Sequence, residues 1–143
     1  MQRPGPVLPG LMQDWPLTTD RILDHAARWH GQREIVSRLE DRRIVRTNWA
    51  DLRARAKRIS SALVARGVKE GDRIATLAMN GGEHLAVWNA VQGIGAVCHT
   101  INPRLFDKQL TYIINHAEDR ILFADGAFAP LLARLLPECR GVE

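Results

Sequence analysis

The chain has 143 residues, of which 45% are hydrophobic and 25% charged, and its formal net charge is +4 at pH 7. These proportions are typical of one globular domain with its own core, and two cysteines are too few for a disulfide-rich scaffold. The positive charge permits an anionic partner, but the basic residues are scattered among carboxylates, so composition alone does not indicate a nucleic-acid surface.

Residues 1–19 are predicted to form an irregular, proline-rich arm, because Pro4, Pro6, Pro9 and Pro16 interrupt any regular element there. The arm contains no apolar run long enough for a signal peptide or a membrane span. The two cysteines lie far apart in the sequence, and neither belongs to a Cys-x-x-Cys motif. A reducing, cytoplasmic location is therefore expected.

The first regular element expected is a short helix that begins at residue 19 or 20 and ends at Gly31. Its apolar positions recur at helical spacing: Ile22, Leu23, Ala26, Ala27 and His30. Residues 34–39 and 43–47 are typical of two strands, and the short polar link between them predicts an antiparallel hairpin.

A longer helix is expected from residue 49 to about residue 66. Asn48 precedes it as an N-cap, Asp51 lies in its first turn, and Gly67 supplies a left-handed stop. One apolar stripe should face the core and contains Trp49, Leu52, Ala56, Ile59 and Leu63.

From residue 73 onward, strands alternate with helices, which predicts an α/β fold with a mainly parallel sheet and crossover helices. The expected strands are 73–79, 96–100 and 120–124, and the expected helices are 83–94, 106–117 and 128–136. The helix 83–94 is apolar on nearly every side, so it and its Trp88 are expected to be buried. The positions expected in the strand interior are Ile74, Leu77, Val97, Ile121 and Phe123.

Several motifs suggest sites but lack the context that the chemistry requires. The glycines of Asn80-Gly81-Gly82 lie between a strand and a helix, where a phosphate could bind, yet no Gly-x-x-x-x-Gly-Lys follows. A tight strand-to-helix connection is the favoured interpretation.

Cys98 and His99 adjoin each other on a predicted strand, so their side chains should point to opposite faces and cannot share one zinc ion. A buried thiol and a hydrogen-bonded histidine are expected instead. The other histidines show no spacing typical of zinc ligands: His25, His30, His84 and His116.

The basic residues of the helix 49–66 are predicted to form a solvated face, because no aromatic residue interleaves with them to stack on bases. They are Arg53, Arg55, Lys57, Arg58 and Arg66. The adjacent serines Ser60 and Ser61 lie mid-helix without the Gly-x-Ser-x-Gly turn of a nucleophile.

The order of the motifs closely resembles the beginning of AMP-forming acyl-CoA synthetases. "TNWADL" (47–52) is followed by "GVKEGDRIA" (67–75), "GAV" (95–97), "HTINPRL" (99–105) and "YIINHAED" (112–119). The pairing of the last two is most similar to the branch that acts on medium- and long-chain fatty acids. The resemblance implies that residues 20–143 form the first part of the large N-terminal domain of an adenylate-forming enzyme, incomplete at its C-terminus.

The resemblance implies a fatty acid-CoA ligase that forms an acyl-adenylate from fatty acid and ATP, releases pyrophosphate, and transfers the acyl group to coenzyme A. ATP, Mg²⁺ and coenzyme A would serve the complete enzyme, with a fatty acid as substrate and a homodimer as a possible assembly. The family's Pro-Lys-Gly loop, Tyr-Gly-x-Thr-Glu segment, adenosine-binding aspartate and C-terminal lysine have no counterpart here.

No catalytic, cofactor-binding or metal-ligating residue is therefore assigned within the chain. The isolated chain is expected to be inactive and to bind none of these cofactors. An alternative from another class is a non-catalytic α/β interaction module or an inactive truncated remnant.

Overall fold

The computed structural model describes residues 10, 14–39 and 41–142. Most of the predicted N-terminal arm lies outside these residues. The helices are α1 (Thr19–His30), α2 (Trp49–Ala65), α3 (Gly82–Gln92), α4 (Asp107–Ala117) and α5 (Ala129–Leu135), and two short 3₁₀ turns, Gly126–Phe128 and Leu136–Glu138, flank α5. The strands are β1 (Glu34–Arg38), β2 (Ile44–Asn48), β3 (Arg73–Leu77), β4 (Val97–Thr100) and β5 (Ile121–Ala124).

These elements form an antiparallel hairpin and a separate parallel sheet, as predicted. Strands β1 and β2 pair antiparallel with Glu34 opposite Asn48, whereas β3 pairs parallel with β4 on one side and β5 on the other. The order β4-β3-β5 places the 73–77 strand in the centre of the sheet. The predicted α/β fold class is confirmed.

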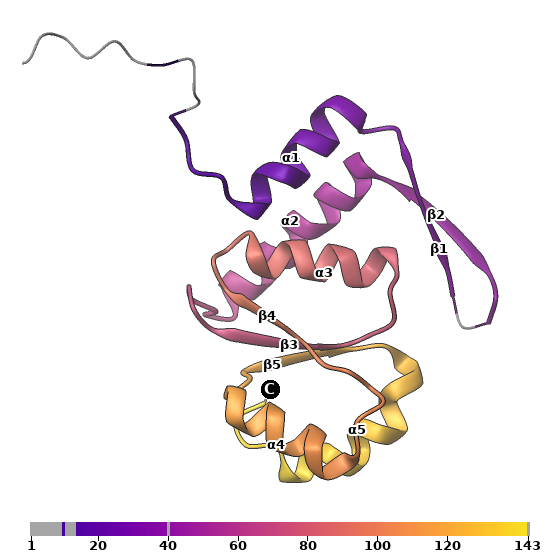
Figure 1. The fold of residues 1–143 in the computed structure, drawn as a ribbon, viewed down its shortest axis with the longest axis vertical. Helices are drawn as coiled ribbons and strands as arrows, with labels where there is room; N and C mark the ends of the chain where they lie inside the picture. Colours follow the sequence, from indigo (N-terminus) through magenta and orange to yellow (C-terminus); the bar gives the residue numbers. More distant parts are fainter. Residues whose placement is uncertain (1–9, 11–13, 40, 143) are drawn as a thin grey trace, which may run out of the picture.

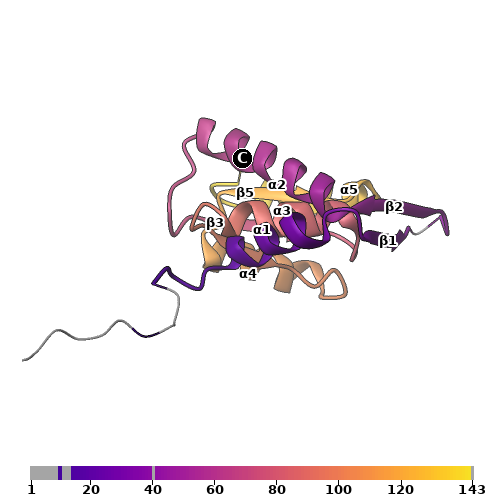
Figure 2. The ribbon, with the colours of Figure 1, turned by 90° about the horizontal axis from the view of Figure 1, so that it is seen from above.

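Helices cover both faces of the parallel sheet (Figure 1). Helices α2 and α3 lie on one face and α4 and α5 on the other, while α1 packs against α2 and α3 on the side away from the sheet. The hairpin projects beyond the layered body, as the view from above shows (Figure 2). No described helix is long and apolar enough to cross a membrane.

Three apolar clusters hold the layers together. The first lies between β3 and helices α2 and α3 and contains Leu63, Val68, Ile74, Val91, Ala96 and Ile121. The second lies on the opposite face of the sheet and contains Ala75, Leu77, Ile101, Leu110, Ile114 and Leu135. The third joins α1, α2 and α3 through Leu23, Leu52, Ala56, Ala86 and Ala90.

The predicted boundaries of α2 are confirmed by its end groups. The Asn48 side chain accepts a hydrogen bond of 2.8 Å from the backbone N–H of Asp51, and its amide donates to the Asp51 carboxylate at 2.9 Å. After the helix, Gly67 has a φ of +78°, a left-handed conformation that residues with a Cβ rarely adopt. The stripe from Leu52 to Leu63 faces the core, as expected.

Two expected core positions are exposed. Trp88 is 37% exposed, because α3 turns its small residues Ala86 and Ala90 toward α2. Val97 is 49% exposed, because β4 forms an edge of the described sheet. The predictions of a buried Trp88 and an interior Val97 are wrong.

Helix α4 provides a matched test of the core. Leu110→Ala should lower the free energy of unfolding of the 143-residue chain by about 2–5 kcal/mol, because the side chain is 0% exposed and its removal leaves a cavity. Tyr112→Ala on the same helix should change it by less than about 0.5 kcal/mol, because Tyr112 is 64% exposed. Urea unfolding of both variants measures the difference, and equal losses would contradict the placement of α4.

Candidate functional site

The candidate site lies where the three parallel strands end. In open α/β sheets, ligands bind beside the carboxyl ends of the strands. Here β3, β4 and β5 end at Leu77, Thr100 and Ala124, on the side where the hairpin projects (Figure 1). Two depressions therefore flank the hairpin at this edge.

The smaller depression is a mostly apolar groove of about 530 Å³. Its walls come from β1, the turn after β3, the first turns of α3 and the end of β4. The lining residues are Ile35, Val36, Ser37, Asn80, Gly81, Gly82, His84, Leu85, Trp88 and Thr100. The exposed side of Trp88 thus contributes to the wall of this groove.

The turn Asn80-Gly81-Gly82 is bound to the hairpin. The backbone N–H of Gly82, the first residue of α3, donates a hydrogen bond of 2.9 Å to the Ser37 hydroxyl, which is nearly buried. Glu83 follows with an exposed carboxylate in the first turn of the helix. An anion at this helix start would meet a donor already in use and a negative charge beside it.

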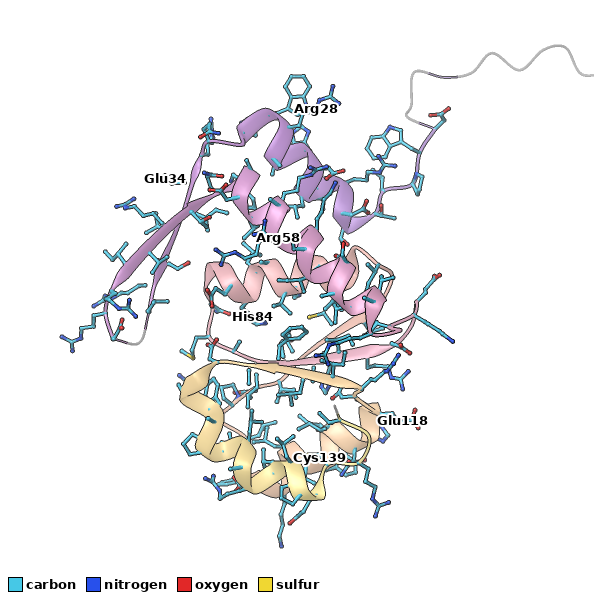
Figure 3. The ribbon with its side chains drawn as sticks, turned by 180° about the vertical axis from the view of Figure 1, so that it is seen from behind. Arg28, Glu34, Arg58, His84, Glu118 and Cys139 are labelled. Carbon is cyan, nitrogen blue, oxygen red and sulfur yellow. The ribbon has the colours of Figure 1, made fainter. Side chains whose placement is uncertain are left out.

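A polar chain connects the groove to the sheet. His84, which Figure 3 labels, lies on α3, and its Nε2 atom is 2.9 Å from the hydroxyl of Thr76, a β3 residue that is 1% exposed. Burial raises the pKa of the Cys98 thiol, and the Thr76 hydroxyl opposes that shift only in part. Cys98 therefore stays protonated near neutral pH and is a poor nucleophile.

The larger depression, of about 950 Å³, lies between the hairpin, α2 and the loop after β5. Its lining carries charges of both signs, including Arg55, Arg58, Glu83 and Asp125. The Asp125 carboxylate accepts a hydrogen bond of 2.6 Å from the backbone N–H of Met79 and so joins the ends of β5 and β3. This carboxylate was not identified from the sequence, although its position directly after a predicted strand was a usable signal.

The structure separates Cys98 from His99, as predicted for neighbours on a strand. Cys98 packs against the cluster between the sheet and α2 and α3. His99 Nδ1 instead lies 2.7 Å from a carboxylate oxygen of Asp119. The described residues include no group of three or more histidines, cysteines or acids arranged to hold a metal ion.

The Asp119 carboxylate is buried at the junction of α4 and β5. Its side chain is 0% exposed, and its Oδ1 atom has no hydrogen-bond partner among the described residues. Burial raises the pKa of Asp119, and the hydrogen bond from His99 opposes that shift only in part. Arg73, which donates to the backbone carbonyls of Ala117 and Glu118, also opposes the rise in the pKa of this carboxyl through its positive charge.

The basic face of α2 is partly neutralised by neighbouring helices. Arg53 is bonded to Asp24 of α1, which lowers the pKa of that carboxyl, and Arg55 lies 3.4 Å from Glu83 of α3. The two serines donate to backbone carbonyls, Ser60 to Ala90 at 2.9 Å and Ser61 to Lys57 at 3.0 Å. Neither hydroxyl lies beside a histidine that could activate it.

Comparison with known proteins gives a family match over most of the chain. Residues 23–142 match the model described as "AMP-binding enzyme". A 3-methylmercaptopropionyl-CoA ligase of Ruegeria lacuscaerulensis is 53% identical over 134 residues, covering 94% of this chain and 25% of the relative. A medium-chain-fatty-acid–CoA ligase of Ectopseudomonas oleovorans is 45% identical, covering 88% of this chain and 23% of the relative.

Solved structures show the same fold. Coronafacic acid ligase from Pectobacterium brasiliense superposes with a TM-score of 0.79 at 22% identity, over 89% of this chain and 25% of the ligase. The chain thus spans about a quarter of the length of the proteins that it matches.

The buried carboxylate generates a prediction about pH. The pKa of Asp119 is raised in the folded chain. Its contribution to the free energy of unfolding is therefore complete below the pKa of about 3.9 that it has in the unfolded chain, and this contribution is lost as pH rises through its pKa in the folded chain. Asp119→Asn removes this titration. The free energy of unfolding of the variant, measured with urea at a series of pH values, should therefore improve relative to the native chain as pH rises through that window.

Asp72 supplies a control of opposite sign. Its pKa is lowered by the backbone N–H of Lys69 and by Arg120, so its stabilisation is present at neutral pH and is lost as pH falls. Asp72→Asn should lose stability relative to the native chain as pH rises. If both variants shift in the same direction, the assignment of a raised pKa to Asp119 is wrong.

Proposed function

The chain belongs to the AMP-binding enzyme family, and from this membership we propose that it supplies the N-terminal part of an AMP-forming acyl-CoA ligase. The observation that carries the proposal is the 53% identity to a CoA ligase across 94% of the chain. The predicted resemblance to acyl-CoA synthetases is confirmed at the level of the family. Activity belongs to the complete polypeptide, in which ATP, Mg²⁺ and coenzyme A are used.

The proposed substrates are aliphatic carboxylic acids. The relatives support this class, because one is named for a thioether-containing short acid and another for medium-chain fatty acids. The sequence-based prediction was narrower, a medium- or long-chain fatty acid. The higher identity to the 3-methylmercaptopropionyl-CoA ligase favours including short acids in the class. The homodimer and the cytoplasmic location stay predictions.

The proposed role of this segment is to support the reacting groups. The turn at Gly82 has its N–H bonded to Ser37, and the groove beside it contains no lysine. Phosphoryl and acyl transfer require cations and donors aimed at the developing charge. These groups would come from the remainder of the ligase, while the present chain supplies the sheet and helices that position them.

A chimera tests this role. The corresponding quarter of the Ruegeria lacuscaerulensis ligase is replaced by residues 1–143, and coenzyme A ester formation is measured with 3-methylmercaptopropionate, octanoate and palmitate. The chimera should keep kcat/KM within about tenfold of the parent on the parent's acid, a change of at most about 1.4 kcal/mol in transition-state stabilisation. A control chimera with Ile74→Asp in β3 should be inactive, because that side chain is 0% exposed.

A folded but inactive first chimera would contradict the proposal, and circular dichroism separates that outcome from misfolding. The acid panel distinguishes the substrate class: activity restricted to octanoate and palmitate would restore the narrower prediction of a medium- or long-chain fatty acid.

The isolated chain provides a second test. Residues 1–143 should show no micromolar affinity for ATP by calorimetry with Mg²⁺ and no release of pyrophosphate that depends on added acid. The reason is that the candidate phosphate turn, Asn80-Gly81-Gly82, combines an occupied N–H with the exposed Glu83 carboxylate. Micromolar ATP binding would show that a nucleotide site exists within this chain and that its role extends beyond support.

A further inference from the structure

A buried ionisable pair joins strand β4 to the end of α4. The Nδ1 atom of His99, on β4, lies 2.7 Å from Oδ2 of Asp119, the second residue after α4. The side chain of Asp119 is 0% exposed and that of His99 is 23% exposed. Any further polypeptide that packs on this fold can only increase that burial. The pair therefore does not depend on a free surface.

The main chain around Asp119 is fixed at the end of α4. The N–H of Asp119 donates to the carbonyl of Ile114 at 3.2 Å. The N–H of Glu118 donates to the carbonyl of Asn115, also at 3.2 Å, and the two bonds form a Schellman turn. Glu118, labelled in Figure 3, has the left-handed φ of +53° that such a turn requires. Asp119 is thus held in place by its own side of the contact, independently of His99.

The other partner lies on a strand with fewer neighbours. Within the described sheet, β4 pairs with β3 alone, and near its carboxyl end the N–H of Ile101 donates to the Thr76 carbonyl at 2.9 Å. Thr100 follows His99 directly and lines the apolar groove at the carboxyl edge of the sheet. The contact with Asp119 therefore fastens the part of β4 that contributes to the groove wall.

Few other groups balance the charge of the Asp119 carboxylate. Among the described residues, the cations that act on it are His99 and Arg73. Arg73 of β3 also donates to the Glu118 carboxylate at 2.9 Å, so its charge is shared. Cys139, labelled in Figure 3 after α5, is the remaining titratable neighbour, and burial, with a smaller effect of nearby carboxylates that include Asp119, raises the pKa of its thiol. A neutral thiol does not offset the carboxylate.

We propose that His99 and Asp119 form a proton-linked latch for the carboxyl end of β4. While the imidazole and the carboxyl hold one titratable proton between them, the pair has no net charge and a hydrogen bond joins β4 to the end of α4. When pH rises, this proton leaves to water through the partly exposed imidazole, and a carboxylate stays buried beside a neutral ring. The latch is a property of the fold and does not depend on ligase activity.

Loss of the proton favours opening of the latch. A buried carboxylate without a fully charged partner is costly, so the state in which water reaches Asp119 becomes more populated. Since Asp119 is fixed by the turn after α4, the end of β4 is the part that moves away. Thr100 moves with it, and the wall of the groove thereby responds to pH.

Hydrogen exchange of the 143-residue chain, followed by NMR, tests the latch. Between about pH 6 and about pH 9, the protection of the Ile101 N–H, corrected for the intrinsic exchange rate, should fall by at least about tenfold, because release of one proton changes an opening equilibrium by up to about tenfold per pH unit. The N–H of Val97, which donates to the Asp72 carbonyl at 2.8 Å at the other end of β4, should change much less. The imidazole nitrogen signals of His99 should titrate in the same pH range.

Three variants assign the effect to the pair. Asp119→Asn removes the titrating carboxyl while its amide can still bond to the imidazole, so the protection of Ile101 should become independent of pH. His99→Asn keeps an N–H donor near the position of Nδ1 but cannot carry the proton. At about pH 6 it should therefore show the low protection that the native chain shows at about pH 9. His116→Asn is the matched control, because His116 is an exposed histidine of the same segment, and this variant should behave like the native chain.

Several results would overturn the proposal. Equal losses of protection at Val97 and Ile101 would show that the whole chain responds to pH rather than the end of β4. A pH dependence that persists in Asp119→Asn would assign it to another group, and a native chain whose Ile101 protection does not change with pH would exclude the latch. Circular dichroism identifies a variant that does not fold, and in that case the pH series of the native chain decides alone.

Discussion

Strand β3 is buried on both faces and hydrogen-bonded along both edges, and the helices on either side of the sheet are positioned against it. Residues 74–77 are between 0% and 1% exposed. Ile74 packs toward α2 and α3, whereas Leu77 packs toward α4 and α5. The polar residue among them, Thr76, is accommodated because its hydroxyl is hydrogen-bonded to His84. The same contact ties the central strand to the candidate groove.

The sequence predicted where helices and strands lie more accurately than it predicted which side of each helix or strand is buried. The continuous apolar run of β3, the Asn48 cap and the Gly67 stop are local signals, and all three are confirmed. The predictions that Trp88 and Val97 are buried failed for a different reason, since the exposure of these side chains depends on neighbours that are distant in the sequence. Helix α3 approaches α2 through Ala86 and Ala90, close enough for the Ser60 hydroxyl to reach the Ala90 carbonyl, and this turns the bulky Trp88 outward. Hydrophobicity alone cannot predict that a helix will bury its smallest side chains.

The contact between His99 and Asp119 joins two of the sequence motifs on which the family resemblance rests. "HTINPRL" and "NHAED" were informative as a pair, and the structure joins them through the 2.7 Å contact between imidazole and carboxylate. The contact fastens the edge strand β4 to the junction of α4 and β5, twenty residues further along the chain. A buried carboxylate without a charged or hydrogen-bonded partner is costly, so each residue restricts what the other can be. The sequence predicted a hydrogen bond for His99 but could not identify the partner.

The candidate groove depends on the hairpin being held against the start of α3. A two-stranded hairpin is marginal by itself in water, so β1 and β2 depend on contacts with the rest of the chain for their position. Ser37 provides one such contact by accepting the first N–H of α3, a donor that a phosphate would otherwise need. The hydrogen bond that holds this wall of the groove in place thus uses an N–H that could otherwise bind a ligand. This use of the N–H supports the proposed supporting role of the hairpin and the Gly82 turn.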